Sequence, residues 1–411
     1  MSKPLPTHAP MTQFPVVDDC LVVGGERLPE LAARVGRTPF YAYDRRVMAE
    51  RVALLRQFLP RAVKIHYAVK ANPMPEVVAH LAGLVDGLDV ASAGELGIAL
   101  RSGIDAREIS FAGPGKSEDE LRQAVATGIL LNVESAREVR VLGRLAAELG
   151  ARPRVAVRIN PDFELKSSSM KMGGGPKPFG VDAEQVPGLL REIGQLRLGF
   201  EGFHIFSGSQ NLKAQAICEA QCKSFDLAVD LAREAPSSVR VLNVGGGFGI
   251  PYFPGELPLD LRPIGENLAA LASRAATALP QAELVVELGR YLVGEAGIYV
   301  CRIIDRKVSR GHVFLITDGG LHHHLSASGN FGQVIRKNYP VVIGNRVQGA
   351  RREIASVVGP LCTPLDLLAE NMEFAEAREG DLVAIFQSGA YGRTASPVNF
   401  LSHPPPVEIL V

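Results

Sequence analysis

Residues 63–102 read VKIHYAVKANPMPEVVAHLAGLVDGLDVASAGELGIALRS, and their pattern predicts the fold of the larger part of the chain. A short apolar run at residues 63–69 is followed, after a turn with asparagine and proline, by an amphipathic helical pattern at residues 75–84. The same order returns at once, with a strand pattern at residues 87–91 and a helical pattern at residues 93–102. This alternation predicts parallel strands that are joined by right-handed helical crossovers.

The alternation continues along the chain as far as about Gly289. Further strand candidates lie at residues 109–112, 129–133, 154–159, 198–205, 239–244 and 283–288. Helical patterns at residues 117–127 and 136–149 lie between them. About eight such units are enough to close a parallel sheet. We therefore predict an α/β fold whose larger part is a (β/α)8 barrel of the TIM type.

The pattern changes after Gly294, where strand-like runs follow one another with few long helices between them. These runs lie at residues 298–305, 312–317, 340–343, 355–358 and 382–386. Such a composition predicts a mainly antiparallel β domain. We expect residues 1–42 to form an N-terminal segment that contributes to the β domain, residues 43–294 to form the barrel, and residues 295–411 to form the β domain.

Composition excludes several classes of protein. The 411 residues include 44 basic and 44 acidic side chains, so the chain lacks the cationic surplus that nucleic-acid or membrane-surface binding requires. No uninterrupted apolar stretch approaches the ~18 residues of a membrane span. The five cysteines form no CxxC pair, and Met1 to Gln13 shows no secretory signal. We expect a cytoplasmic protein.

Polar residues gather at the carboxyl ends of the predicted strands, where barrel active sites lie. The first of them is Lys70, which ends the first strand. Desolvation at such a position lowers the pKa of a lysine, which suits a Schiff-base amine. Taken alone, Lys70 is better explained as a lysine that reaches out to solvent at the barrel rim.

Three other strand ends favour the chemical interpretation. The GGGFG run, Gly245 to Gly249, offers successive unhindered backbone amides to a phosphate, and Glu287 offers a carboxylate that could keep a pyridine nitrogen protonated. His204 offers a ring that could stack on a cofactor. Taken singly, the glycine run could form a tight turn, Glu287 could pair with Arg158 or Arg290, and His204 could be a structural histidine. Together with Lys70 they point to pyridoxal 5'-phosphate.

The motifs and their order resemble the fold-type III pyridoxal-phosphate-dependent decarboxylases, the family of diaminopimelate, ornithine and arginine decarboxylases. The likeness runs from about Val22 to Phe400. It is carried by YAVKAN at residues 67–72, DVASAGE at 89–95, HIFSGSQ at 204–210, GGGFG at 245–249, ELGR at 287–290, GPLCTPLD at 359–366 and SGAYG at 388–392. The resemblance implies a two-domain architecture like that of alanine racemase.

The resemblance also implies site residues. The cofactor-binding residues would be Lys70, Asp89, His204, Ser209, Gly245, Gly246, Gly247, Glu287, Gly289, Arg290 and Tyr391. The catalytic residues would be Lys70, His204, Glu287 and Cys362. In the family the cysteine enters the active site of the partner subunit, which implies a homodimer with shared active sites. Cys362 would then return a proton to the carbon that loses carbon dioxide.

The substrate pocket departs from the family pattern. Relatives carry a carboxylate directly after the cysteine, where it reads a distal amino group, but this chain has Thr363. The resemblance implies a substrate site made of Arg290, Arg336, Tyr339, Thr363 and Tyr391. We expect a decarboxylase of the diaminopimelate type. The alternatives are a decarboxylase of an aminoacyl group tethered to a carrier protein, and an amino-acid racemase, which Glu287 disfavours because racemases of this shape usually place an arginine there.

Three consecutive histidines, His322 to His324, invite a metal interpretation. Adjacent side chains cannot all face one ion, and no carboxylate or cysteine stands at ligand spacing beside them. We therefore predict no metal, and we expect these histidines to lie in a loop or at the rim of the active site.

Overall fold

The computed structural model describes residues 7–163, 170–171 and 173–411. The chain divides into two compact units. The barrel unit comprises Arg51–Ile250 and Leu259–Tyr291, and the β unit comprises the remainder of the chain. The sequence-based domain boundaries at residues 42/43 and 294/295 stay a prediction, and the first six residues of the expected N-terminal segment lie outside the described residues.

Eight parallel strands of the described chain close the barrel in the order β9-β12-β14-β15-β5-β6-β7-β8, and β8 pairs back to β9. They are β5 (Val63–Ala68), β6 (Gly87–Val90), β7 (Ile109–Phe111), β8 (Leu130–Val133), β9 (Arg154–Asn160), β12 (Gly199–Ile205), β14 (Val241–Gly246) and β15 (Glu283–Leu288). The predicted (β/α)8 barrel is therefore confirmed. Short strands accompany it, namely β10 (Met170–Lys171), β11 (Val181–Asp182) and β13 (Gly208–Ser209).

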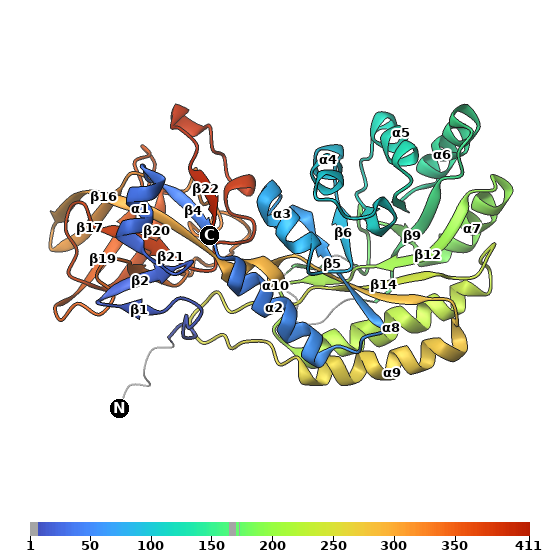
Figure 1. The fold of residues 1–411 in the computed structure, drawn as a ribbon, viewed down its shortest axis with the longest axis horizontal. Helices are drawn as coiled ribbons and strands as arrows, with labels where there is room; N and C mark the ends of the chain where they lie inside the picture. Colours follow the sequence, from blue (N-terminus) through green and yellow to red (C-terminus); the bar gives the residue numbers. More distant parts are fainter. Residues whose placement is uncertain (1–6, 164–169, 172) are drawn as a thin grey trace. The chain divides into compact units, whose positions relative to one another are not determined.

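Helices flank the strands of the barrel (Figure 1). They are α3 (Pro75–Ala82), α4 (Ala93–Arg101), α5 (Glu118–Thr127), α6 (Ala136–Leu149), α7 (Val186–Gln195), α8 (Ala214–Ala232) and α9 (Arg262–Ala278), with α10 (Arg290–Val293) after β15 and α2 (Arg45–Phe58) before β5. Local sequence sets their ends. Helix α6 begins where the Ser135 side chain accepts the amide of Glu138, and it ends at Gly150 with φ 60°.

The β unit is built around the long strand β16 (Gly297–Ser309), which pairs antiparallel with β17 (His312–Thr317), β21 (Leu382–Ile385) and β4 (Phe40–Tyr43). Strands β18 (Val341–Ile343), β19 (Arg352–Val358), β20 (Leu367–Ala375) and β22 (Val407–Leu410) complete this sheet. The pairs β17–β19 and β22–β4 are parallel, and the others are antiparallel. The mainly antiparallel β domain is therefore confirmed.

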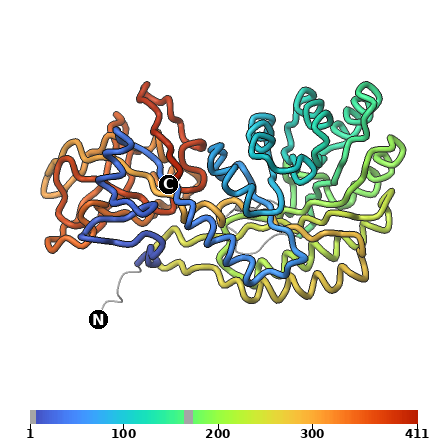
Figure 2. Tube along the Cα trace, viewed as in Figure 1, coloured from blue at the N-terminus to red at the C-terminus, as the bar shows by residue number. Residues whose placement is uncertain are grey.

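Chain segments that are far apart in sequence meet in the β unit. Strand β4 lies between β16 and β22, so the blue and red ends of the trace run side by side (Figure 2). A small sheet of β1 (Val16–Val17), β2 (Cys20–Val23) and β3 (Glu26–Arg27), with helix α1 (Leu28–Val35), completes this unit. In the part of the chain that the structure describes, no helix is long and apolar enough to span a membrane.

Polar side chains fill part of the barrel interior. His66, Asp89, Ser110 and Asn132 are buried at 8% exposure or less, although each lies on a strand of mainly apolar residues. The alternating residues of β5, such as Ile65 and Tyr67, are fully buried apolar side chains. This polar interior lies beneath the strand ends at which the sequence places its candidate residues.

Candidate active site

Lys70 and Glu287 lie at the carboxyl ends of neighbouring strands. Lys70 sits in the short 3-10 helix that follows β5, and its Nζ lies 3.6 Å from Oε1 of Glu287 on β15. The same Nζ is 5.5 Å from the ring centre of Phe206. The Lys70 side chain is 43% exposed, whereas that of Glu287 is 6% exposed. A lysine that is both accessible and paired with a buried carboxylate can exchange that partner for another group.

Glu287 is held as a carboxylate. Burial by itself would raise its pKa, but the charge of Lys70, the hydrogen bond to His204 and the charge of Arg158 together lower the pKa far below its ordinary value. The Nε2 of His204 lies 3.0 Å from Oε2 of Glu287. The structure thus brings together Lys70, His204 and Glu287, which the sequence analysis singled out.

The GGGFG run packs against the segment that carries Ser209. The Asn211 amide donates to the Gly247 carbonyl at 2.9 Å, and the Gly249 amide donates to the Asn211 carbonyl at 2.9 Å. A Cβ at residue 247 would lie 2.2 Å from the carbonyl oxygen of Gly208, and Gly247 has φ 73°. Glycine is therefore required where these two loops approach each other.

Gly289 and Gly246 extend this close packing toward the lysine. A Cβ at residue 289 would lie 2.9 Å from Cβ of Ala71, the neighbour of Lys70. A Cβ at residue 246 would lie 2.0 Å from the carbonyl oxygen of Glu287. Arg290 follows as the first residue of α10 and is half-buried. The glycines allow backbone to approach backbone at the same strand ends.

A second buried ion pair supports this end of the barrel. Arg158 on β9 donates to Oε1 of Glu134 at 2.8 Å, and the Gly180 amide donates to Oε2 at 3.0 Å. Burial would raise the pKa of Glu134, but the positive charges of Arg158 and Lys116 and these hydrogen bonds lower it. The charge of Arg158 also helps to lower the pKa of Glu287.

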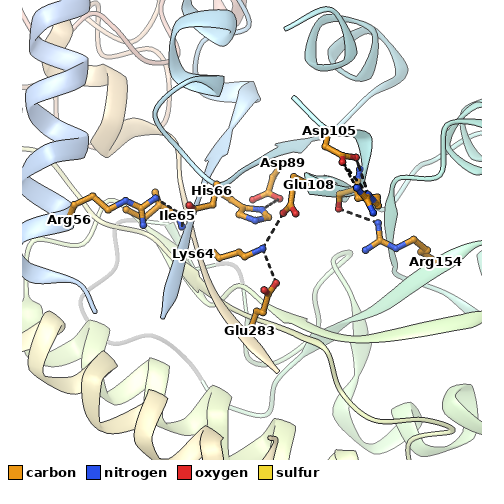
Figure 3. Close-up of polar contacts among 11 residues, drawn as sticks. Arg56, Lys64, Ile65, His66, Asp89, Asp105, Glu108, Arg154 and Glu283 are labelled. Carbon is orange, nitrogen blue, oxygen red and sulfur yellow. Dashed lines mark hydrogen bonds and ion pairs between the residues drawn. The ribbon is translucent and has the colours of Figure 1, made fainter. Parts of the chain in front are cut away.

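Sequence reasoning missed His66, which lies inside the barrel. Its Nδ1 is 3.0 Å from Oδ1 of Asp89, and the Ser110 hydroxyl donates to the same Oδ1 at 2.6 Å (Figure 3). The sequence feature that could have identified His66 is a histidine within a largely apolar strand, two residues before Ala68.

The residues at these strand ends fit pyridoxal 5'-phosphate. Two buried polar atoms, Nδ1 of His204 and Oδ2 of Asp89, have no hydrogen-bond partner among the described residues. A buried polar atom is costly to leave unpaired, so these atoms point to a group that this chain does not supply itself. With the accessible amine of Lys70 and the glycine-lined loops, they match an aldehyde-bearing, phosphorylated pyridine.

Cys362 and Thr363 belong to the β unit, in the segment between β19 and β20. Cys362 is exposed. Asp366 anchors the segment, because its two oxygens accept the amides of Leu321 at 2.6 Å and Leu361 at 2.8 Å. Thr363 lines a cavity of about 570 Å³. The expected approach of Cys362 to a lysine of the barrel stays a prediction.

Arg336 and Tyr339 also lie in the β unit, and both side chains contact other residues of that unit. The Arg336 guanidinium donates to Ser328 O at 3.2 Å, to Asn338 Oδ1 at 2.6 Å and to Leu367 O at 2.9 Å. Tyr339 is buried, and its ring centre lies 4.7 Å from that of Tyr252. Their assignment to the substrate site stays a prediction.

Tyr391 has φ 52°, and its carbonyl accepts the Ser326 hydroxyl at 3.0 Å. His322, His323 and His324 lie in the loop that follows β17, which is one of the two expected alternatives, and all three are buried at 1% exposure or less. His324 supports the tyrosine segment through Nε2, which lies 2.8 Å from the Ser388 hydroxyl. The expectation that these histidines bind no metal stays a prediction.

Comparison with known proteins gives a consistent result. Residues 45–294 match the family described as pyridoxal-dependent decarboxylase, pyridoxal binding domain. The L-glutamyl-[BtrI acyl-carrier protein] decarboxylase of Niallia circulans is 39% identical over 383 residues, which cover 91% of this chain and 88% of the relative. The diaminopimelate decarboxylase of Aquifex aeolicus is 34% identical over 397 residues, which cover 96% and 91%.

A solved structure extends the likeness to three dimensions. The diaminopimelate decarboxylase of Helicobacter pylori, complexed with L-lysine, is 28% identical and superposes with a TM-score of 0.82. The match covers 93% of this chain and 94% of the other. The similarity therefore includes the β unit as well as the barrel.

Proposed function

Since this chain belongs to the pyridoxal-dependent decarboxylase family, and is thus a pyridoxal-phosphate-dependent carboxy-lyase, we propose that its substrate is an aminoacyl group tethered to a carrier protein. The group that we propose is glutamyl, joined to the carrier through its side-chain carboxyl so that the free α-carboxylate can leave as carbon dioxide, because the relative with 39% identity is named for a glutamyl group on an acyl-carrier protein.

Different residues of the barrel would have different roles in cofactor binding and catalysis. When bound, pyridoxal phosphate accepts the electron pair that carbon dioxide leaves behind. Lys70 would hold the cofactor until the substrate amine replaces it, and Glu287 would hold a proton on the pyridine nitrogen. Gly245 to Gly247 and Ser209 would bind the phosphate. These assignments rest on the geometry at the strand ends and on the family resemblance.

The state of Arg336 is the observation that carries the substrate proposal. Three of its N–H groups donate to Ser328, Asn338 and Leu367, and Glu370 lies 3.8 Å away. A guanidinium that already makes these hydrogen bonds has few N–H donors left for the distal carboxylate of a free diaminopimelate.

The segment after Cys362 gives independent support. Thr363 carries no charge, and the carboxylate of Asp366 is turned inward toward the backbone amides of Leu321 and Leu361. A free diamino acid would therefore lack a carboxylate partner in this segment for its distal ammonium. A tethered glutamyl group presents no distal ammonium, and the cavity of about 570 Å³ beside Thr363 offers room within the β unit.

We also propose that the active enzyme is a homodimer with shared active sites, located in the cytoplasm. The exposed Cys362 would enter the partner's site and give its Sγ proton to the carbon that has lost carbon dioxide. Exposure on a well-anchored segment suits a residue that acts across an interface. The five free cysteines are consistent with a reducing compartment.

The test is carbon dioxide release from purified protein loaded with cofactor. The substrates are glutamyl thioester on a carrier protein, free glutamate, free diaminopimelate, lysine and ornithine. We expect release from the tethered glutamyl group and little from the free amino acids. Release from free diaminopimelate at a comparable rate would contradict the proposal and restore the diaminopimelate decarboxylase alternative.

Two controls sharpen this experiment. Glutamyl-pantetheine, which carries the arm without the carrier protein, separates recognition of the arm from recognition of the protein. The Lys70→Ala variant shows how much release occurs without the cofactor lysine. Racemisation of the free amino acids, followed in the same samples, tests the racemase alternative.

A further inference from the structure

The pair formed by His66 and Asp89 lies inside the barrel, below the strand ends described above. The Nδ1 of His66 is 3.0 Å from Oδ1 of Asp89, and the exposed fractions of the two residues are 8% and 6%. Ser110 donates to the same Oδ1, and Asn132 donates to the Ser110 hydroxyl at 3.1 Å. These contacts fix the orientation of the carboxylate and leave Oδ2 without a partner among the described residues.

Gly87 makes room for the His66 ring. His66 and Gly87 are direct partners on the paired strands β5 and β6. A Cβ at residue 87 would lie 2.4 Å from Nε2 of His66 and 2.7 Å from the carbonyl oxygen of Glu108. The imidazole therefore occupies a position that any residue larger than glycine at 87 would block.

The charged groups around His66 carry both signs. Asp89 contacts it from β6, Glu108 lies in the 3-10 helix before β7, and Glu287 on β15 is its direct partner in register. The nearby cations are Lys64 on its own strand and Arg107 and Arg154, which line the same cavity as His66. Burial would lower the pKa of His66, but the charges of Asp89, Glu108 and Glu287 and the Asp89 hydrogen bond together raise it above its ordinary value.

Solvent can reach His66 from the end of the barrel opposite Lys70. His66 and Ser110 line a cavity of about 340 Å³ whose other lining residues include strand-start residues such as Lys64 and Glu283. Lys64 bridges two carboxylates there, at 3.3 Å from Glu108 and 2.9 Å from Glu283 (Figure 3). His66 can thus exchange protons without passing them through the cofactor site.

We propose that His66 is a positioning residue that carries a positive charge in the folded enzyme, orients Asp89 below the cofactor and offsets the buried charges of Asp89 and Glu287. The imidazolium donates from Nδ1 to Oδ1 of Asp89, so that Oδ2 is left for the cofactor side. This role does not depend on which aminoacyl group is the substrate.

The protonation state can be measured directly by 15N NMR of the wild-type protein labelled at histidine, with and without cofactor. The His66→Asn variant assigns the His66 signals. We expect both ring nitrogens of His66 to carry protons at pH 7, and the midpoint of its titration to lie above the ordinary 6.5 of histidine. A singly protonated His66 ring at pH 7 overturns the proposal.

The second readout is the pH midpoint at which the visible absorbance of the bound cofactor changes. His66→Asn keeps a donor toward Asp89 but removes the positive charge, so nearby groups hold their protons more tightly and the midpoint rises by about one pH unit. Ser110→Ala is the matched control, because it removes an uncharged donor from the same Oδ1 and should move the midpoint by much less.

Equal shifts in the two variants, or no shift in either, contradict a charge role for His66. The NMR measurement uses the wild-type chain, so it decides the question even if His66→Asn fails to fold.

Discussion

The Nζ of Lys70 lies 3.6 Å from Oε1 of Glu287, at the ends of two paired barrel strands. A half-exposed cation thus stabilises a buried anion. The pair keeps Glu287 ionised before any cofactor binds, because the positive charge lowers its pKa. The charges of the protein itself therefore keep Glu287 ionised.

Replacement of the lysine tests this relationship. Lys70→Ala should abolish covalent cofactor binding and lower decarboxylation by at least about 10³-fold. It should also cost the cofactor-free protein about 1–2 kcal/mol, since Glu287 loses a partner that is itself half-exposed. Urea unfolding and the visible spectrum measure the two effects. Lys64→Ala, which removes a lysine from the other end of the same strand, is the control and should retain the cofactor spectrum.

Glu287→Gln keeps the shape of the side chain but not its charge. We expect decarboxylation to fall by about 10²–10⁴-fold, because the amide cannot hold a proton on the pyridine nitrogen. The folded-state pKa of Glu287 is lowered, so its ionised form stabilises the wild-type protein above about pH 4.5, and that contribution is lost as the pH falls further. The stability difference between wild type and variant should therefore shrink below pH 4.5 in urea unfolding. A difference that grows toward acid pH would contradict this assignment.

The buried histidines predict an acid sensitivity of the β unit. Burial, His323 and His403 lower the pKa of His322 to about 3, and burial lowers the pKa of His324 to about 3. Such groups lower the free energy of unfolding as the pH falls from about 6.5 toward 3, because over this range the unfolded chain binds protons that the folded chain does not.

Two phenylalanine variants separate the roles of these rings. Neither ring nitrogen of His322 has a partner among the described residues, so His322→Phe should raise the free energy of unfolding by about 1 kcal/mol and weaken the acid dependence. His324→Phe should cost about 1–3 kcal/mol, since it removes the contacts with Ser388 and Ala327. Thermal unfolding between pH 4 and pH 7 measures both, and equal effects of the two variants would count against this distinction.

Mixing two inactive variants tests the shared active site. Lys70→Ala and Cys362→Ala should each be inactive alone. If Cys362 acts across the dimer, a refolded equal mixture should regain roughly a quarter of the wild-type activity, because half of the dimers are mixed and each mixed dimer has one complete site. Absence of recovery, with mixed dimers demonstrated by affinity tags, would place both residues in the same subunit's site.

Local sequence signals were sufficient for most of the barrel. Helix α6 was predicted with its observed bounds because Ser135 and Gly150 cap it and apolar residues recur on one face. Strand β20 was missed, since Glu370 and Glu373 interrupt its apolar residues and Asn371 adopts φ 48°. Strands β4 and β22 were missed because their pairing joins the two ends of the chain.

The candidate site, like the fold, could be predicted only in part. Lys70, His204 and Glu287 were predicted because each ends a strand, and strand ends of one barrel must converge. The partners of Arg158 and His66 depend on register, such as the pairing of Val133 with Val157 and of His66 with Gly87. Sequence periodicity does not define register between strands that are far apart in the chain.

The most direct test of the proposed function compares one chemical group in two forms, free 1-14C-labelled glutamate and the same glutamyl group tethered to a carrier protein through its side-chain carboxyl. The measured quantity is kcat/KM for release of labelled carbon dioxide by the cofactor-loaded enzyme. We expect the tethered form to be favoured by at least about 10²-fold, since binding of the carrier and its arm stabilises the transition state. Equal values for the two forms, or faster turnover of free diaminopimelate, would contradict the proposed function.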